Sequence, residues 1–240
     1  MSDTSFHIQY HELNEADYKN AWEFQTLLHN ELKAHKFRKN ASIPSKNKTF
    51  SPNHLVFCEH TPVITMGKSG KVSHLTSDAQ TLESAGIEYY KINRGGDITY
   101  HGPGQITGYL IFDLEQWQRD VHLFVRTIEG CIIEFLGLYG LTGLRLDGYT
   151  GVWLERDNKL WKICAIGVHL SRWVSMHGFA LNINTHLPDF DHIVPCGIDE
   201  PDKEVTSLQK ELGMEIDFDN ARHQLKEIVV KAFDGVLIGQ

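Results

Sequence analysis

Apolar side chains recur every three or four residues in three long segments of the chain. The first segment covers residues 14–39, and its period leaves one stripe to be buried against other parts of the protein. The second follows Asp120, a good N-cap residue, and Gly140 lies beyond its end. The third runs from Asp217 to Phe233. The pattern therefore predicts three amphipathic helices.

Shorter apolar runs between turn residues predict β-strands. These runs are His54–Glu59, Val63–Met66, Ile87–Ile92, Gln105–Leu114, Gly151–Glu155, Leu160–Leu170 and Val174–Ile183. A polar turn at residues 156–158 is typical of a hairpin between two of them. Ser77 and Gln80 form a capping box for a short helix that ends near Gly86. No repeat, low-complexity tract or linker divides the sequence, so we expect residues 1–240 to form one domain.

A glycine-rich segment lies near the middle of the chain. From Arg94 to Gln105 it reads R-G-G-D-I-T-Y-H-G-P-G-Q. Four glycines and a proline disfavour the interior of a helix or strand, because glycine loses backbone entropy there and proline lacks an N–H donor. We therefore expect a shaped loop between two strands that can present backbone N–H groups to a ligand. A purely structural turn is the alternative, because glycine clusters commonly mark turns.

Composition narrows the function classes. Of the 240 residues, 41% are hydrophobic and 22% are charged, as in ordinary globular proteins. With 23 basic and 31 acidic side chains, the net charge is −8, which argues against a non-specific nucleic-acid binder. No apolar run approaches the ~18 residues of a membrane span. The first residues resemble neither a secretory nor an import signal, so we expect a cytoplasmic protein without a membrane segment.

The cysteines and histidines predict neither disulfides nor a metal site. The four cysteines are far apart without a C-x-x-C pair, so we expect free thiols. The 14 histidines show no metal-binding spacing, and we expect no metal. Cys131 lies at the edge of an apolar helix stripe and is interpreted as a buried hydrophobic residue. Cys196 lies between Pro195 and Gly197 in a loop predicted over residues 184–202, where a thiol is a better candidate nucleophile.

A lysine interrupts one of the predicted strands. In L-W-K-I-C-A-I-G, alternation places Trp161, Ile163 and Ala165 on one face. Lys162, Cys164 and Ile166 then share the other face. If Lys162 points inward, its ammonium must be paired or its pKa shifted, because burying an isolated charge is costly. The alternative is an edge strand whose lysine faces water.

Basic residues gather between Leu32 and Cys58. They are Lys33, Lys36, Arg38, Lys39, Lys46 and Lys48, and no acidic residue lies among them. Such a run is usually a solvated face. The alternative is a landing site for an acidic partner.

Several motifs occur in an order that resembles one known family. They are E-H-T-P-V-I-T-M-G (59–67), R-G-G-D-I-T-Y-H-G-P-G-Q (94–105), K-I-C-A-I-G-V (162–168), H-G-F-A-L-N (177–182), I-V-P-C-G-I (193–198) and V-T-S-L (205–208). Together they resemble the lipoyl/octanoyl transferases, the LipB enzymes. The resemblance implies an α/β fold of the α+β type, similar to biotin and lipoate protein ligases, with a mixed, mostly antiparallel sheet flanked by helices. It also implies transfer of an octanoyl group from octanoyl-acyl carrier protein to a lysine of a lipoyl domain, without a cofactor.

The resemblance also implies site residues and partners. Cys196 matches the family's acyl-accepting cysteine, and Lys162 matches the lysine that pairs with it. The family's substrate-binding positions match Arg94, Gly95, Gly96, Asp97, Ile98, Thr99, Tyr100, His101, Ala165, Ile166, Gly167, Gly178, Phe179 and Ala180. The implied acceptors are the lipoyl domains of 2-oxoacid dehydrogenase E2 subunits and the glycine cleavage H protein. The family often has alanine at the position of Cys164, so a second thiol lies near the expected site.

Acyl transfer from a thioester to an amine requires an activated nucleophile. A thiol with a pKa near 8.5 is only about 3% ionised at neutral pH. A nearby Lys162 ammonium would favour the thiolate of Cys196. Lys162 could then take a proton from the incoming amine, and His101 and His177 are lower-ranked candidates for that role.

The acyl chain needs an apolar slot and its carbonyl needs hydrogen-bond donors. Burying eight carbons contributes roughly 5 kcal/mol at about 0.8 kcal/mol per methylene. We expect Tyr100 and Phe179 to be walls of the slot. Backbone N–H groups beside Cys196, or those of Ala165, Ile166 and Gly167, are the candidate oxyanion donors.

Three other functions stay open on these residues. An ATP-dependent lipoate or biotin protein ligase on the same fold would need no covalent cysteine. A thioesterase would use Cys196 with water as the acceptor. A non-catalytic module would only bind acyl carrier protein. The ordered motifs favour the transferase.

Overall fold

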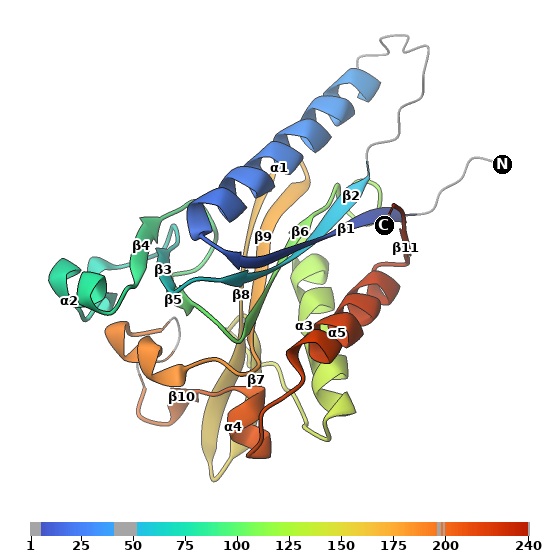
Figure 1. Cartoon of the computed structure of the whole chain (residues 1–240). Coiled ribbons are helices and arrows are strands. Elements are labelled where there is room, and N and C mark those ends of the chain that lie inside the picture. The colour runs from blue at the N-terminus through green and yellow to red at the C-terminus, as the bar shows by residue number, and fades with distance from the viewer. Residues whose placement is uncertain (1–5, 41–51, 196–197, 199, 240) are drawn as a thin grey trace.

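Eleven strands in two sheets organise the described part of the protein (Figure 1). The structure is a computed structural model, and it describes residues 6–40, 52–195, 198 and 200–239. The larger sheet has the order β10-β8-β9-β6-β2-β1-β11, and β7 pairs with β8. Its strands are β1 (Phe6–Ala16), β2 (Asn53–His60), β6 (Gln105–Ile111), β7 (Val152–Arg156), β8 (Lys159–Ser171), β9 (Val174–Asn182), β10 (Lys203–Val205) and β11 (Gly235–Leu237). Most pairings are antiparallel, which confirms the expected mixed sheet.

The smaller sheet contains β4, β3 and β5 in that order. Its strands are β3 (Val63–Met66), β4 (Glu88–Lys91) and β5 (Ile98–His101). The β5 strand corrects the expectation of an uninterrupted loop from Arg94 to Gln105. Its residues I-T-Y-H contain no glycine, and Ile98 and Tyr100 are fully buried where β5 pairs with β3. Strand propensity and burial therefore decide the conformation between the flanking glycines.

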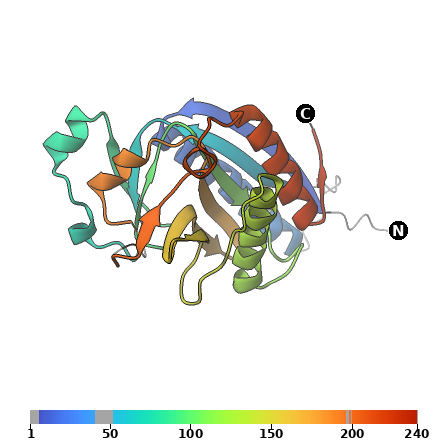
Figure 2. The same ribbon diagram turned by 90° about the horizontal axis from the view of Figure 1, so that it is seen from below.

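Helices cover both faces of the larger sheet (Figure 2). The two helices α3 (Val121–Leu138) and α5 (Phe218–Ala232) pack on one face, where their stripes join Leu55 and Phe57 of β2 in the main core. The long helix α1 (Tyr18–Asn40) packs against the opposite face, where it meets Val56. Neighbouring residues of β2 alternate between the two cores, as the pleat of a strand requires. All three predicted helices are confirmed.

Shorter elements connect these layers. They are the 3₁₀ turns η1 (Val72–His74) and η2 (Leu187–His192), with the helices α2 (Ala79–Ser84) and α4 (Leu208–Leu212). The α2 helix exists as expected, but its N-cap is Asp78, whose side chain accepts from the Thr81 N–H at 2.8 Å. The Ser77 hydroxyl instead hydrogen bonds with His192 Nδ1. No helix in the described ranges is long and apolar enough to cross a membrane.

Two edge regions of the sheet differ from the sequence prediction. The β1 strand occupies residues where the first helix was expected to begin, and α1 starts only at Tyr18. Phe6 and Ile8 of β1 are buried, while most of the later β1 residues are partly or fully exposed. The β11 strand, which pairs with β1, was also missed. Both strands form because β2 and β1 supply parallel partners that lie far away in the sequence.

Candidate functional site

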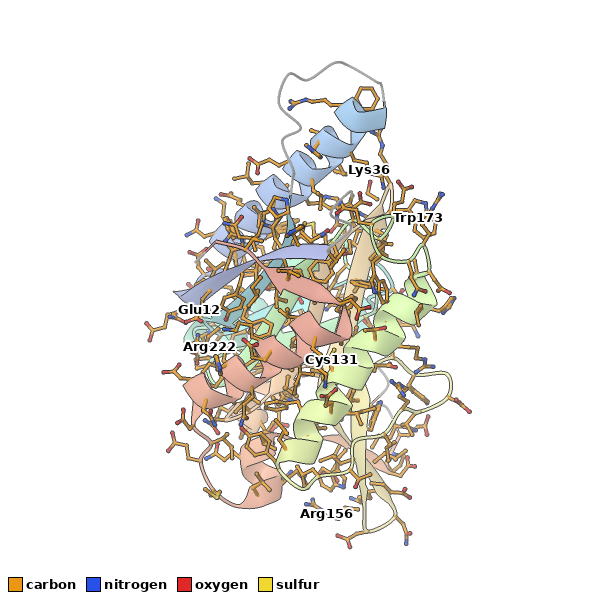
Figure 3. The ribbon with its side chains drawn as sticks, turned by 90° about the vertical axis from the view of Figure 1, so that its right-hand side faces the viewer. Glu12, Lys36, Cys131, Arg156, Trp173 and Arg222 are labelled. Carbon is orange, nitrogen blue, oxygen red and sulfur yellow. The ribbon has the colours of Figure 1, made fainter. Side chains whose placement is uncertain are left out.

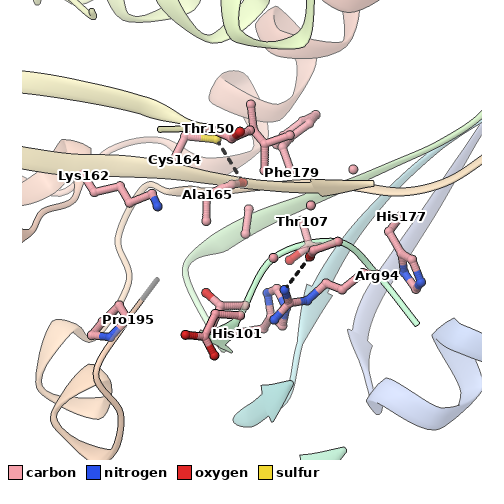
Figure 4. A pocket seen from close by; sticks show the side chains of 18 of the residues that line it. Arg94, His101, Thr107, Thr150, Lys162, Cys164, Ala165, His177, Phe179 and Pro195 are labelled. Atoms are coloured by element: carbon pink, nitrogen blue, oxygen red, sulfur yellow. Dashed lines mark hydrogen bonds between the residues drawn. The ribbon is translucent and has the colours of Figure 1, made fainter. Parts of the chain in front are cut away.

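Lys162 lies beside a β-bulge in β8. The pairing of β7 with β8 shifts register next to Trp153, which makes Ile163 an extra residue in β8. In Figure 4 the side chains of Lys162 and Ala165 point to one side of β8, and the Cys164 thiol points to the other. The prediction that Lys162 and Cys164 share a face is therefore wrong, because it assumed regular alternation.

The Lys162 side chain points inward. It is only 7% exposed, and its ammonium nitrogen lies 5.0 Å from the centre of the Trp153 ring. A cation over an aromatic face is stabilised by the ring quadrupole. Gly151 packs directly against this lysine, because a Cβ at that position would lie 3.1 Å from Lys162 Cε. Of the two alternatives for Lys162, the structure thus has the buried one.

A cavity of about 360 Å³ lies along an uncovered stretch of β8. On one edge of this strand, β7 pairs as far as Cys164. Further along the same edge, the Gly95 N–H donates to the carbonyl oxygen of Val168 at 3.0 Å. Ala165, Ile166 and Gly167 lie between these two points and line the cavity. Its volume is at the lower end of the range typical of small-molecule sites.

Most residues singled out from the sequence line this one cavity. They are Arg94, Gly95, Gly96, Asp97, Ile98, Thr99, His101, Lys162, Ala165, Ile166, Gly167, His177, Gly178, Phe179 and Ala180. Tyr100 is the exception, because its hydroxyl donates to Asp189 Oδ2 at 2.6 Å and its ring packs edge-on against Phe190. The expectation that Tyr100 forms a wall of the cavity is therefore wrong. On a strand, the side chain next to His101 necessarily points to the opposite face.

Cys196 and Gly197 lie outside the described residues. Pro195 and Ile198, on either side of them, line the cavity. Figure 4 shows Pro195 on the side of β8 to which Lys162 points. Contact between Lys162 and Cys196 stays a prediction.

Cys164 is a poor nucleophile in this structure. Its side chain is 1% exposed and contributes to the main core as well as to the cavity wall. Burial raises the pKa of the Cys164 thiol, and the opposing effect of the Lys162 charge is smaller. A thiol that stays protonated does not attack a thioester. Cys131 is also buried, as expected, and burial raises its pKa to about 12.

Arg94 shapes the cavity through contacts with β3. Its Nε and Nη2 donate to Thr65 Oγ1 at 3.2 and 3.1 Å, and Nη2 also donates to the Thr65 carbonyl oxygen at 2.6 Å. Because Thr65 Oγ1 accepts from Arg94, its own proton is directed to Nε2 of His101, 3.3 Å away. Both Arg94 and His101 are less than 10% exposed. Arg94 therefore holds the glycine-rich segment against the smaller sheet.

The hydrogen-bond chain continues from His101 across the larger sheet. His101 Nδ1 donates to Gln105 Oε1 at 2.8 Å, and Gln105 Nε2 donates to Asn182 Oδ1 at 2.8 Å. Asn182 Nδ2 then donates to the Thr206 carbonyl oxygen at 2.9 Å. The Thr206 N–H donates to the carbonyl oxygen of Lys162 at 3.0 Å. These bonds tie the backbone of Lys162 to the opposite wall of the cavity.

The two cavity histidines are weak bases. Burial is the main cause that lowers the pKa of His177 to about 3, and it lowers the pKa of His101 well below the ordinary value. His177 also has a hydrogen-bond partner for Nε2, because Asn93 Oδ1 lies 3.0 Å away. Both rings are neutral at neutral pH, and neither is poised to hold a transferred proton.

The basic residues predicted between Leu32 and Cys58 have different surroundings in the structure. Lys36 forms ion pairs of 2.9 Å with Asp113 and with Glu115, so its charge is compensated within the protein. The side chains of Lys39, Lys46 and Lys48 lie outside the described residues. Lys33 is half-buried where α1 faces the turn between β8 and β9.

Some cavity residues were not recognised from the sequence. They are Tyr18, Gln105, Thr107, Tyr109, Val125, Gly148, Tyr149, Thr150, Cys164, Val168, Asn182, Phe190, Pro195, Ile198 and Val205. Seven of them lie within the quoted motifs, so motif membership was the available signal for Gln105, Cys164, Val168, Asn182, Pro195, Ile198 and Val205. The others are brought to the cavity by long-range packing. In the part of the chain that is described, no cluster of three or more His, Cys, Asp or Glu side chains could hold a metal ion.

Comparisons with known proteins identify the family of this chain. The family model "Lipoyl protein ligase A/B catalytic domain" matches residues 17–232. The chain is 50% identical over 228 residues to an octanoyltransferase of Parabacteroides distasonis, covering 94% of this chain and 98% of the relative. It is 45% identical over 236 residues to an octanoyltransferase of Flavobacterium johnsoniae, covering 96% and 98%.

Solved structures share the fold at low sequence identity. A bipartite lipoate protein ligase of Thermoplasma acidophilum superimposes with a TM-score of 0.68 at 14% identity, covering 98% of this chain and 87% of that one. A lipoate-protein ligase A bound with ATP gives a TM-score of 0.64 at 15% identity, covering 98% and 90%.

Proposed function

Because the chain belongs to the family of lipoyl protein ligase A/B catalytic domains, we propose that it transfers octanoyl groups to lysine side chains of lipoyl domains. Relatives with up to 50% identity, of which the chain covers nearly the whole length, are octanoyltransferases. We further propose that residues 1–240 form one catalytic domain. A cytoplasmic location stays a prediction.

One structural observation carries the proposal. The Lys162 ammonium points into a cavity whose wall includes Pro195 and Ile198, the described neighbours of Cys196. A buried lysine that lines an acyl-sized cavity, next to a segment that carries a thiol, suits thioester exchange because its ammonium can favour the thiolate. An ATP-dependent ligase on the same fold would not need this pair.

The first half-reaction forms an acyl-enzyme. The Lys162 ammonium favours the thiolate of Cys196, which attacks the carbonyl carbon of the octanoyl thioester. The carbonyl double bond reforms, the carbon–sulfur bond to the carrier breaks, and the carrier thiolate leaves. That thiolate takes up the proton of the Lys162 ammonium, which leaves Lys162 neutral. Cys196 then carries the octanoyl group as a new thioester.

The second half-reaction forms the amide. The acceptor lysine must lose a proton before it attacks, because an amine with a pKa of about 10.4 is almost fully protonated at neutral pH. Neutral Lys162 is the base that we assign, since the pKa values of His101 and His177 are lowered by burial. Attack by the neutral amine on the Cys196 thioester forms the carbon–nitrogen bond and breaks the carbon–sulfur bond. The second proton of the amine nitrogen passes to water, the Cys196 thiolate returns, and Lys162 is again an ammonium.

The cavity supplies an apolar environment for the acyl chain. Ile166 and Phe179 line it, and both contact the main core. The Phe179 ring lies on Gly108, where a Cβ would approach it to 2.2 Å, so this wall is tightly defined. On the uncovered edge of β8, the Ile166 N–H can supply a donor for the oxyanion, because Ala165 and Gly167 direct their backbone groups towards β9.

The finer identity of the partners is also proposed. We assign octanoyl-acyl carrier protein as the donor. We assign the lipoyl domains of 2-oxoacid dehydrogenases and of the glycine cleavage H protein as acceptors.

Intact mass tests the proposal directly. The protein is incubated with octanoyl-acyl carrier protein beside the Cys196→Ser and Cys164→Ser variants. We expect one octanoyl adduct that is lost only in Cys196→Ser and discharged when a lipoyl domain is added. No adduct in any sample, with transfer only when ATP and free octanoate are supplied, would identify a ligase. Free octanoate released at the full rate without acceptor would identify a thioesterase. A thioester that persists unchanged would leave only a binding module.

A further inference from the structure

One face of α1 holds the turn between β8 and β9. His29, Lys33 and Lys36 are spaced at i, i+4 and i+7, so they lie on one stripe of the helix. His29 Nε2 lies 3.2 Å from the carbonyl oxygen of Val174, and Lys36 Nζ donates to that of Arg172 at 2.7 Å. Lys33 lies between them and therefore also faces this turn. Figure 3 labels Lys36 next to the turn that contains Trp173.

Three cations and a histidine meet at this position. Lys68 Nζ lies 3.5 Å from Nδ1 of His169, and the His169 ring centre lies 6.2 Å from that of His29. Arg172 is exposed at the tip of the turn. We call Lys33, Lys68, His169 and Arg172 the cationic cluster. They come from α1, from the residues after β3, and from the β8–β9 hairpin.

The cationic cluster is not neutralised by the described part of the protein. No ion pair joins Lys33, Lys68 or Arg172 to an acidic side chain among the described residues, whereas Lys36 on the same stripe has two. The like charges affect one another. Burial first, and then the Arg172 charge, lower the pKa of Lys33. Burial, followed by the charges of Lys68 and Lys33, lowers the pKa of His169.

The cationic cluster contrasts with the rest of the chain, whose net charge is −8. Repulsion among the cations costs free energy in the isolated protein, and an anionic partner would remove that cost. The observation favours a binding role over a merely solvated face.

The cationic cluster adjoins the cavity. His169 directly follows Val168, which lines the cavity and pairs with His177 on β9. His169 lies two residues beyond Gly167, about 7 Å along the strand, and on the same side of β8. A large partner seated on these cations would thus lie at the end of the cavity that Val168 and His177 form.

We propose that the cationic cluster is the docking surface for the acidic carrier protein that delivers the acyl thioester. This inference rests on the proposed function and specifies where its donor binds. Charge complementarity selects the occupant: an acidic protein surface supplies several carboxylates, which three separated cations can each meet. The basic stretch recognised in the sequence contributes only Lys33 to it among the described side chains.

Charge reversal with two donors tests the assignment. We compare Lys33→Glu, Lys68→Glu and Arg172→Glu with Lys231→Glu, a matched reversal on the exposed end of α5. Transfer is measured from octanoyl-acyl carrier protein and from octanoyl-pantetheine, which has the thioester arm without the protein. We expect each cluster variant to raise KM for the protein donor about five- to tenfold, while kcat and the KM for octanoyl-pantetheine stay within about twofold. Added salt should raise the wild-type KM for the protein donor and affect the variants less.

Binding without reaction separates this inference from the proposed function. Fluorescence anisotropy of labelled acyl carrier protein lacking the acyl group should show weaker binding to the cluster variants and unchanged binding to Lys231→Glu. If the wild type binds the carrier protein but transfers no octanoyl group, the proposed function fails and the docking surface stands. If Lys231→Glu weakened binding of the carrier protein as much as the cluster variants do, the docking surface would be overturned. An increase in KM for the lipoyl domain alone would also overturn it, since the cluster would then serve the acceptor.

Discussion

The imidazole of His74 and the carboxylate of Asp97 form a part-buried hydrogen-bonded pair. Asp97 belongs to the glycine-rich cavity wall, and His74 ends the η1 turn. The His74 carbonyl oxygen accepts from the Val194 N–H at 2.7 Å, and Leu75 bridges to Ile193. The pair therefore connects one cavity wall to the residues that directly precede Pro195 and Cys196.

We expect Asp97→Asn and His74→Ala to slow acyl-enzyme formation about tenfold or more, because a displaced nucleophile loses its alignment with the thioester. The measurement is single-turnover transfer of octanoyl to the enzyme. The control is His186→Ala, which removes a surface histidine that bonds to Asp189. Unchanged single-turnover rates in both test variants would show that this connection does not position the nucleophile.

Replacement of Lys162 tests the assigned base. Lys162→Met keeps the side-chain length and removes the charge, so we expect the transfer rate to fall by about 10²–10⁴. The rate of Cys196 alkylation by iodoacetamide should also fall, since less thiolate is present. Lys159→Met is the matched control on the same strand. The Lys159 ammonium does not line the cavity, and it pairs with Glu204 at an N–O distance of 2.7 Å. Equal losses in both variants would refute a specific role for Lys162.

Gly108 controls the position of a cavity wall. A Cβ there would lie 2.2 Å from the Phe179 ring, so Gly108→Ala must displace that ring, which lines the cavity. We expect the ratio of hexanoyl to octanoyl transfer to rise about tenfold, because each lost methylene contact is worth about 0.8 kcal/mol. Phe179→Leu should shift the preference towards decanoyl. Gly137→Ala in α3, where nothing lies within 4 Å of the added Cβ, should leave chain-length preference unchanged. The same preference in all variants would place the acyl chain elsewhere.

Acid should destabilise the protein through its buried histidines. Burial lowers the pKa of His60 to about 4 and that of His177 to about 3, whereas an unfolded histidine titrates near 6.5. Between pH 6.5 and about 4 the unfolded chain therefore binds more protons than the folded one, and the free energy of unfolding falls as the pH falls. His60, which is 1% exposed, contributes on the order of 3 kcal/mol to this loss.

Urea unfolding at several pH values between 7.5 and 4 measures this effect. A free energy of unfolding that does not change across this range would show that the buried rings are protonated in the folded state.

Local patterns predicted the elements that bury one clear stripe. The α3 and α5 helices follow from their apolar period, and the predicted N-cap of α3, Asp120, is observed. Asp217 caps α5 in the structure, although the sequence analysis used it only as the start of the segment. The β1 strand was not predicted, because its alternating residues include histidines and a glutamine and its partners β2 and β11 are distant in sequence. Long-range pairing decides such segments.

The candidate site was predicted as a set of residues but not as a geometry. The motifs contain most of the residues that line the cavity, but not those that come from other parts of the chain, such as Tyr18, Tyr109 and Tyr149. They did not show that Arg94 is engaged with Thr65, that Tyr100 turns towards Asp189, or that Cys164 is buried apart from Lys162. Each of these depends on contacts between elements that sequence spacing does not encode.

The extra residue at Ile163 makes the site sensitive to the length of β8 as well as to its composition. Regular pairing leaves no place for Ile163 between Lys162 and Cys164, and a β-bulge accommodates it. Because of this bulge, Lys162 faces the cavity. If Ile163 were instead paired regularly, simple alternation would turn Lys162 towards the layer of α3 and α5, with every side chain of the site still present in the chain. Natural variation in this strand should therefore avoid a further inserted residue between Lys162 and Cys164, with insertions placed instead in the turn at residues 157–158.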